Sequence, residues 1–229
     1  TGKRFWHSVI VRKPILLLVM SLVVVAIGGI FELIPTFLIK SNIPTIASVK
    51  PYTPLELQGR DIYVREGCYT CHSQMIRPFR YEVMRYGEYS KAGEFVYDHP
   101  FQWGSKRTGP DLARIGGKYP DSWHFNHMLD PASMSPGSVM PKYPWLFRRD
   151  LDLSSTNSKI SAMRSLGVPY EAGYEAKANA DLAEQADKIA ASLKTDKIEI
   201  SSKKEIIALI AYLQRVGKDI KSDPKVAVK

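Results

Sequence analysis

Apolar residues form one long run near the N-terminus. No charged residue occurs between Pro14 and Phe31, and after Glu32 the apolar pattern continues to Ile39. A helix needs roughly 20 apolar residues to cross the hydrocarbon core of a membrane, whereas a run of about 10–14 is more typical of a core helix. The pattern therefore predicts a single transmembrane helix, preceded by a short cytoplasmic tail, within residues 1–39.

The rest of the chain combines helical patterns with irregular segments. Residues 40–54 contain three prolines and no helical period, which predicts an extended linker. Apolar residues at helical spacing follow at about 55–66, at 121–129 and at 205–217. We therefore expect a mainly α-helical domain over residues 55–229.

A polar segment interrupts this domain at about 151–203. Within it, residues 170–194 have the spacing and composition of a helix that is rich in alanine and mixed in charge. Helices of this kind usually have a solvated face, and a docking surface for another subunit is the alternative. The sequence predicts an inserted helical segment and leaves its role open.

Charge is distributed unevenly along the chain. The formal net charge is +9, yet residues 1–50 hold six lysines or arginines and one acid, Glu32. A nucleic-acid-binding protein would instead carry a basic stripe on its folded domain. By the positive-inside rule the basic N-terminus lies in the cytoplasm, so the chain after about Ile39 lies outside. A cleaved signal peptide is the alternative, but its apolar core is only about 7–15 residues long.

One motif carries most of the recognisable chemistry. The only two cysteines, Cys68 and Cys71, precede His72 in the string C-Y-T-C-H. Cys-x-x-Cys-His is the attachment signature of c-type haem, in which the thiols bond the porphyrin and the imidazole faces the iron. A zinc site would need two further ligands, a redox-active pair would sit in a βαβ context, and a disulfide would close a negligible loop. The motif predicts one covalent haem c.

The iron of such a haem needs a sixth ligand or an open position. A methionine thioether opposite His72 raises the reduction potential and suits electron transfer, whereas an open position suits gas binding or catalysis. Met134 and Met140 lie in a proline-rich loop, the kind of rigid segment that crosses a haem face. We favour Met140, with Met134 as the second choice and with His99 and His124 as less favoured rivals. A methionine that only fills the core is the alternative.

The order of motifs resembles that of a class I cytochrome c domain: C-Y-T-C-H, then G-P-D-L, then M-P, then the apolar helix EIIALIAYLQRVG. In that family the proline carbonyl before the aspartate accepts the proximal imidazole N–H, which maps onto Pro110 and fixes the ring's orientation. The resemblance also implies a close crossing of the first and last helices. The crossing would involve Gly59 and Tyr63 in the first helix and Leu209 and Tyr212 in the last.

Three longer strings are similar to the monohaem subunit of cbb3-type cytochrome c oxidases, the FixO/CcoO family. They are TCHSQMIRP, DHPFQWGSKRTGPDLARIGGKYPDSWH and SVMPKYPWL, behind one anchor, and the resemblance covers about residues 1–150. It implies a periplasmic haem domain anchored in the bacterial inner membrane, with no oxygen-reducing centre of its own. The chain would pass electrons from a dihaem cytochrome c subunit or a soluble donor to a multispan catalytic subunit. That complex reduces oxygen to water and pumps protons.

The stretch 75–103 is dense in aromatic residues and arginines. If these residues are exposed, they are typical of protein interfaces. If they are buried, they would line a haem pocket, with the arginines paired to the propionates. Arg77 and Trp123 are our candidates for contact with the cofactor, since an indole N–H donates readily to an acceptor. An ordinary core tryptophan is the alternative. Further candidates for propionate or interface contacts are Arg80, Arg85, Trp103, Lys106 and Arg107.

Two other functions remain open at this point. The anchored cytochrome subunit of a nitric-oxide reductase has the same plan of anchor and domain, although the inserted segment and the three strings disfavour it. A haem enzyme or gas sensor with an open iron position is the second. Carbon monoxide binding to the reduced protein separates the sensor from an electron carrier.

Overall fold

The structure is a computed structural model that describes residues 2–39 and 44–222. It divides into one unit that ends at Pro44 and a second that begins at Thr45. The regular structure of the described residues is helical throughout, apart from an isolated bridge between Asp150 and Lys204. The predicted mainly α-helical class is confirmed.

The first unit consists of two helices, α1 (Gly2–Val11) and α2 (Pro14–Leu38). Proline suits the first position of α2 because its missing N–H has no intrahelical partner there. At 1.5 Å per residue α2 is about 37 Å long. Among the described residues, α2 provides one helix long and apolar enough to cross a membrane, over Pro14–Thr36. The sequence predicted this helix and gave no secondary structure for the short tail that forms α1.

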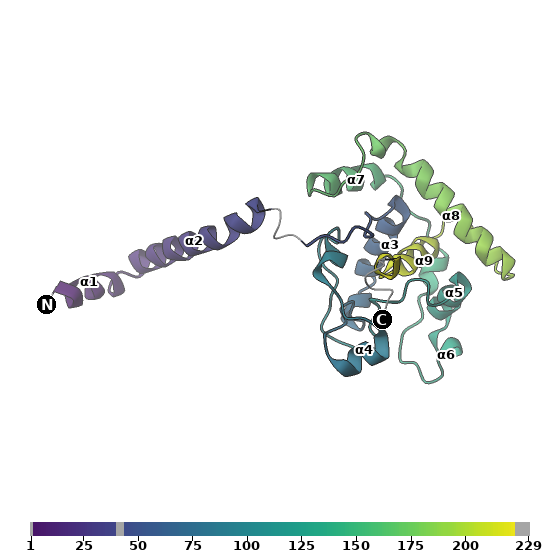
Figure 1. The fold of residues 1–229 in the computed structure, drawn as a ribbon, viewed down its shortest axis with the longest axis horizontal. Coiled ribbons are helices and arrows are strands. Elements are labelled where there is room, and N and C mark those ends of the chain that lie inside the picture. Colours follow the sequence, from purple (N-terminus) through teal and green to yellow (C-terminus); the bar gives the residue numbers. More distant parts are fainter. Residues whose placement is uncertain (1, 40–43, 223–229) are drawn as a thin grey trace. The chain divides into compact units, whose positions relative to one another are not determined.

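Two crossed helices, α3 (Pro54–Arg65) and α9 (Glu205–Arg215), form the centre of the second unit (Figure 1). Gly59 makes the crossing possible, because a Cβ atom at this position would lie 1.9 Å from the carbonyl oxygen of Ala208. Beside this contact the rings of Tyr63 and Tyr212 lie 5.3 Å apart. The close crossing implied by the cytochrome c resemblance is present.

The main hydrophobic core surrounds these two helices. Full burial of one aliphatic or aromatic side chain stabilises the fold by roughly 1.5–3 kcal/mol, so a core of this size dominates the stability of the domain. Its larger buried members are Leu55, Ile62, Tyr63, Phe125, Met128, Leu146, Leu182, Leu193, Ile206, Ile207, Leu209, Ile210, Tyr212 and Leu213.

The inserted segment contributes to this core. It contains α7 (Thr156–Ser165), η5 (Tyr174–Ala176) and α8 (Ala178–Thr195), which lie along the outer side of the second unit (Figure 1). Leu182 and Leu193 on α8 are buried in the main core. A second cluster is formed by Leu57, Ile160, Met163, Val168 and Ala178. The segment is therefore an amphipathic layer of the domain, with one face buried and the other solvated.

Short helices connect the longer ones. The predicted helix at 121–129 is present as α5 (Asp121–Leu129). The remaining elements are η2 (Cys68–Thr70), α4 (Arg80–Tyr86), η3 (Ala92–Phe95), α6 (Pro131–Met134), η4 (Pro144–Phe147) and η6 (Asp219–Ser222).

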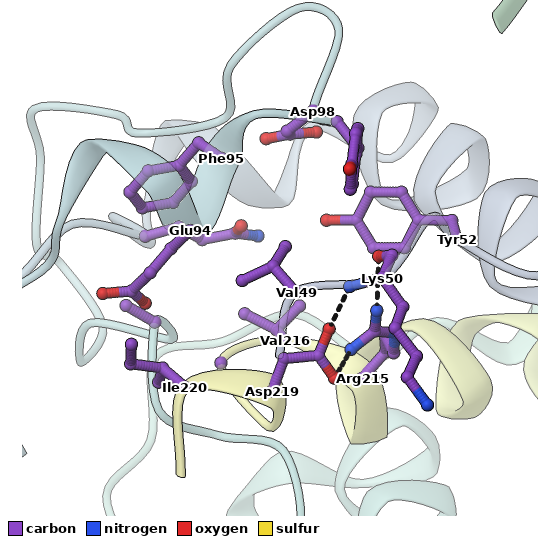
Figure 2. Close-up of a pocket in the computed structure, with 14 residues that line it drawn as sticks. Val49, Lys50, Tyr52, Glu94, Phe95, Asp98, Arg215, Val216, Asp219 and Ile220 are labelled. Carbon is purple, nitrogen blue, oxygen red and sulfur yellow. Dashed lines mark hydrogen bonds and ion pairs between the residues drawn. The ribbon is translucent and has the colours of Figure 1, made fainter. Parts of the chain in front are cut away.

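Part of the stretch predicted as a linker packs on the second unit. The Lys50 N–H donates to Asp219 (2.7 Å), and Arg215 donates to the Lys50 carbonyl (2.6 Å), as Figure 2 shows. The ring of Tyr52 lies 5.8 Å from that of Tyr212. The small cavity beside these residues has a volume of about 50 Å³, which holds a few water molecules. The folded domain thus begins before position 55.

Candidate haem site

The Cys-x-x-Cys-His motif forms one tight turn directly after α3. Gly67, with a φ angle of 70°, ends the helix and starts η2. The backbone N–H of Cys71 and that of His72 both donate to the carbonyl of Cys68, at 3.2 and 3.0 Å. Both thiols are free, and Cys68 is half-buried while Cys71 is exposed. This turn places two thiols and an imidazole in the order that a c-type haem requires.

The imidazole of His72 is held by the loop that carries the G-P-D-L string. Its Nδ1 lies 2.8 Å from the carbonyl oxygen of Pro110. A carbonyl oxygen only accepts hydrogen bonds, so Nδ1 carries the proton and Nε2 is left to bind a metal. Gly109 allows this approach, because a Cβ atom there would lie 2.2 Å from Cε1 of the ring. The backbone thus passes against the imidazole and fixes its orientation.

The Cys68 thiol differs from a free cysteine in its acidity. Burial, with a smaller contribution from Glu66, raises the pKa of the Cys68 thiol to about 12. Such a thiol stays protonated at neutral pH and is a poor nucleophile or metal ligand. Within the part of the chain that the structure describes, no group of three His, Cys, Asp or Glu residues is arranged to hold a metal ion. The tight turn at positions 68–72 and the hydrogen bond to the Pro110 carbonyl fit a c-type haem.

Met140 lies beside the same core as the attachment turn. It is partly buried and packs against the main core, as do Cys68, Tyr119 and Tyr143. Its backbone N–H lies 3.2 Å from the Oγ of Ser138, which holds the loop locally. This placement suits an axial ligand, and the assignment of Met140 stays a prediction.

Two histidines on α5 differ in their surroundings. His124 is 1% exposed, and its Nε2 has no partner among the described residues. Burial lowers its pKa to about 4. His127 is half-buried with an unpartnered Nδ1, and burial and the nearby charge of His72 lower its pKa. His127 lies four positions after Trp123 on α5, and this helical spacing was a signal for a shared face.

The two candidate tryptophans occupy different aromatic clusters. Trp123 is stacked between Tyr119 and His127, with ring centroids 4.0 and 4.5 Å away. Trp103 is stacked on Phe101 at 4.5 Å, and its buried Nε1 has no partner among the described residues. The Trp103 carbonyl accepts the N–H of Gln74 (2.7 Å), two positions after His72. A propionate contact stays a prediction for both Trp123 and Trp103.

The candidate arginines fall into an inner and an outer set. Arg77 and Arg107 both bind the carboxylate of Glu82, which has no exposed surface. Their guanidinium groups therefore already have an anionic partner inside the domain. Arg77 is itself 48% exposed, and the outer set, Arg80, Arg85 and Lys106, is exposed as well. A cofactor contact of Arg77 stays a prediction.

The geometry described above agrees with a comparison of the sequence with known families. Residues 7–220 match the family described as cytochrome C oxidase, mono-heme subunit/FixO. The chain belongs to the FixO family. FixO proteins are the monohaem cytochrome c subunits of cbb3-type oxidases, and the catalytic subunit of that complex is therefore a partner of this chain. No curated protein matches the chain.

The buried His124 predicts a pH dependence of stability for this FixO protein. Its pKa of about 4 in the folded state lies below the ordinary value of 6.5. As the pH falls, the unfolded chain therefore binds a proton at His124 before the folded chain does. The free energy of unfolding is highest above about pH 6.5 and decreases by up to about 3 kcal/mol as the pH falls toward 4. We expect a smaller loss of thermal stability between pH 7 and 4.5 for His124→Phe than for the wild type. Equal decreases in the melting temperature of the wild type and of His124→Phe would show that the pH dependence does not come from His124.

Proposed function

We propose that the protein carries electrons through one haem c, bound covalently by Cys68 and Cys71 and ligated by His72 and Met140. The hydrogen bond between Nδ1 of His72 and the Pro110 carbonyl (2.8 Å) is the observation that supports this most directly. It presents the other ring nitrogen to a metal beside two free thiols. When bound, the haem supplies reversible one-electron redox chemistry.

The residues of the chain set the properties of that site. The Pro110 carbonyl keeps the His72 ring in one orientation and makes it more basic. The Met140 thioether would be the second protein ligand of the haem iron and would raise the reduction potential, which favours electron transfer over ligand binding. Met140 is partly buried and packs against the main core. No proton transfer or bond-making is assigned to this chain.

We further propose that α2 anchors the protein in the bacterial inner membrane, with its N-terminus in the cytoplasm and the second unit in the periplasm. The exposed apolar side chains of α2 support its insertion into a membrane. The basic residues before α2 support this orientation. A dihaem cytochrome c subunit donates electrons, and the multispan catalytic subunit accepts them. The complex reduces oxygen to water and pumps protons. The family match favours this function over a nitric-oxide reductase subunit.

Purification of the tagged full chain in a mild detergent tests this proposal. We expect mass spectrometry to detect a multispan oxidase subunit and a dihaem subunit with it, and denaturing gels to show haem attached to this chain. Recovery of the chain alone, with its haem, would contradict the assembly. Rapid carbon monoxide binding to the reduced chain would contradict the closed sixth position and support a sensor.

A further inference from the structure

A buried carboxylate on α4 is not explained by the proposed electron transfer. Glu82 has no exposed surface and is bound by two arginines. The backbone N–H of Arg77 donates to it (2.8 Å), and Arg107 donates to the same oxygen at 2.7 Å. These contacts lower the pKa of Glu82 to about 2, so the carboxylate is ionised. A buried ion set of this kind needs several well-oriented partners to offset desolvation, so it fixes geometry.

Arg107 extends these contacts to the segment that follows the proximal histidine. Its Nε donates to the hydroxyl of Ser73 (2.7 Å), and its Nη2 donates to the carbonyl of Met75 (2.9 Å). Ser73 is 3% exposed and directly follows His72 in the chain. One guanidinium therefore binds the Glu82 carboxylate on α4 and the backbone next to the imidazole.

The same group reaches the loop that holds the acceptor of the imidazole proton. Asp111 directly follows Pro110, and its Oδ2 lies 3.3 Å from Arg107. This oxygen also accepts the hydroxyl of Ser73 (2.6 Å) and the N–H of Met75 (2.9 Å). The donor and the acceptor of the His72–Pro110 bond thus belong to two different segments. These segments are joined by the contact between Ser73, which follows His72, and Asp111, which follows Pro110.

We propose that Arg107 is a positioning residue for the proximal histidine: it keeps Ser73 and Asp111 together, and through them holds the Pro110 carbonyl against Nδ1 of His72. The inference rests on the proposed haem site. The Ser73–Asp111 contact spans 38 positions of sequence, so local structure does not maintain it. The Nε of Arg107 binds the hydroxyl, and its Nη2 lies within hydrogen-bond distance of the carbonyl and of both carboxylates. An ammonium lacks this planar arrangement of donors.

The Arg107→Lys variant of the full-length holoprotein tests this role, because it keeps the charge and removes the planar group. We expect hydrogen exchange at Nδ1 of His72, followed by NMR, to become about tenfold faster, the factor that corresponds to a loss of about 1.4 kcal/mol from the free energy that holds the imidazole in place. The reduction potential should rise, because a less firmly bonded imidazole is less basic and stabilises the oxidised iron less.

Arg215→Lys is the matched control. Arg215 is also largely buried and binds Glu56, Asp219 and a backbone carbonyl, but no contact joins it to Ser73 or Asp111. Should Arg107→Lys fail to mature, Ser73→Ala removes a single link of the same set and should change exchange and potential in the same direction.

Unchanged exchange and potential in a folded Arg107→Lys or Ser73→Ala variant would overturn the inference, as would equal changes in Arg215→Lys. The iron ligation of the wild-type protein distinguishes a failure of the positioning role from a failure of the proposed function. A wild-type haem without histidine ligation would contradict the haem site itself. A histidine-ligated wild type with an insensitive Arg107→Lys variant would contradict only the positioning role.

Discussion

Replacing Gly59 by valine is expected to prevent the second unit from folding. A Cβ atom at this position would lie 1.9 Å from the Ala208 carbonyl oxygen and 2.8 Å from the Cβ of Tyr212. Both obstacles are rigid, so α3 and α9 would have to separate, and the core between them would open. Overpacking of this severity costs more than about 4 kcal/mol, a large part of the roughly 5–15 kcal/mol that stabilises a domain. Haem-stained gels should show little or no holoprotein.

A graded series makes this prediction specific to the crossing. Gly59→Ala introduces the same Cβ atom and should also lose most of the holoprotein. Gly28→Ala is the matched control, since it is a helical glycine around which no atom lies within 4 Å of an added Cβ. A Gly59→Ala protein with a normal haem content and melting temperature would show that the helices do not approach as closely as described.

Replacing Met140 by alanine is expected to lower the reduction potential and to open the sixth position of the iron. The thioether favours the reduced state, so its loss favours the oxidised state. A fall on the order of 0.1 V is reasonable against the ~0.8 V range that axial ligands set. Redox titration of the full-length holoprotein measures the shift, and carbon monoxide binding to the reduced protein measures the opening.

Met134→Ala is the control for this experiment, because Met134 ends α6 in the same proline-rich region. Its potential should stay close to that of the wild type. A large fall in Met134→Ala with none in Met140→Ala would move the ligand to Met134. No fall in either variant would point to a histidine, and His124 and His127 on α5 would be the next residues to replace.

The features that were predictable from the sequence depend on residues close together in the chain. The apolar run that becomes α2 and the helical periods that become α3, α5 and α9 follow from local spacing. The motif at positions 68–72 also folds locally, as one turn closed by hydrogen bonds to the Cys68 carbonyl.

The inserted segment shows the limit of such reasoning. Its composition is typical of a solvated helix, yet α8 buries Leu182 and Leu193 in the main core. Two or three apolar residues on a mixed-charge helix do not reveal whether a partner surface exists. That surface is formed by α9, which is the next long helix in the chain, and by α3 and α5, which are far away in sequence.

The sequence by itself determined the long apolar helix, the helical class and the thiol–imidazole motif, because each depends on contacts within a few residues. Only the tertiary structure decided that Arg107 faces inward and that Glu82 is fully buried. An arginine in a sequence can equally be a surface charge, a propionate partner or a buried ion pair. The difference is the desolvation of its partners, which arises when segments 25 to 38 positions apart are packed against each other.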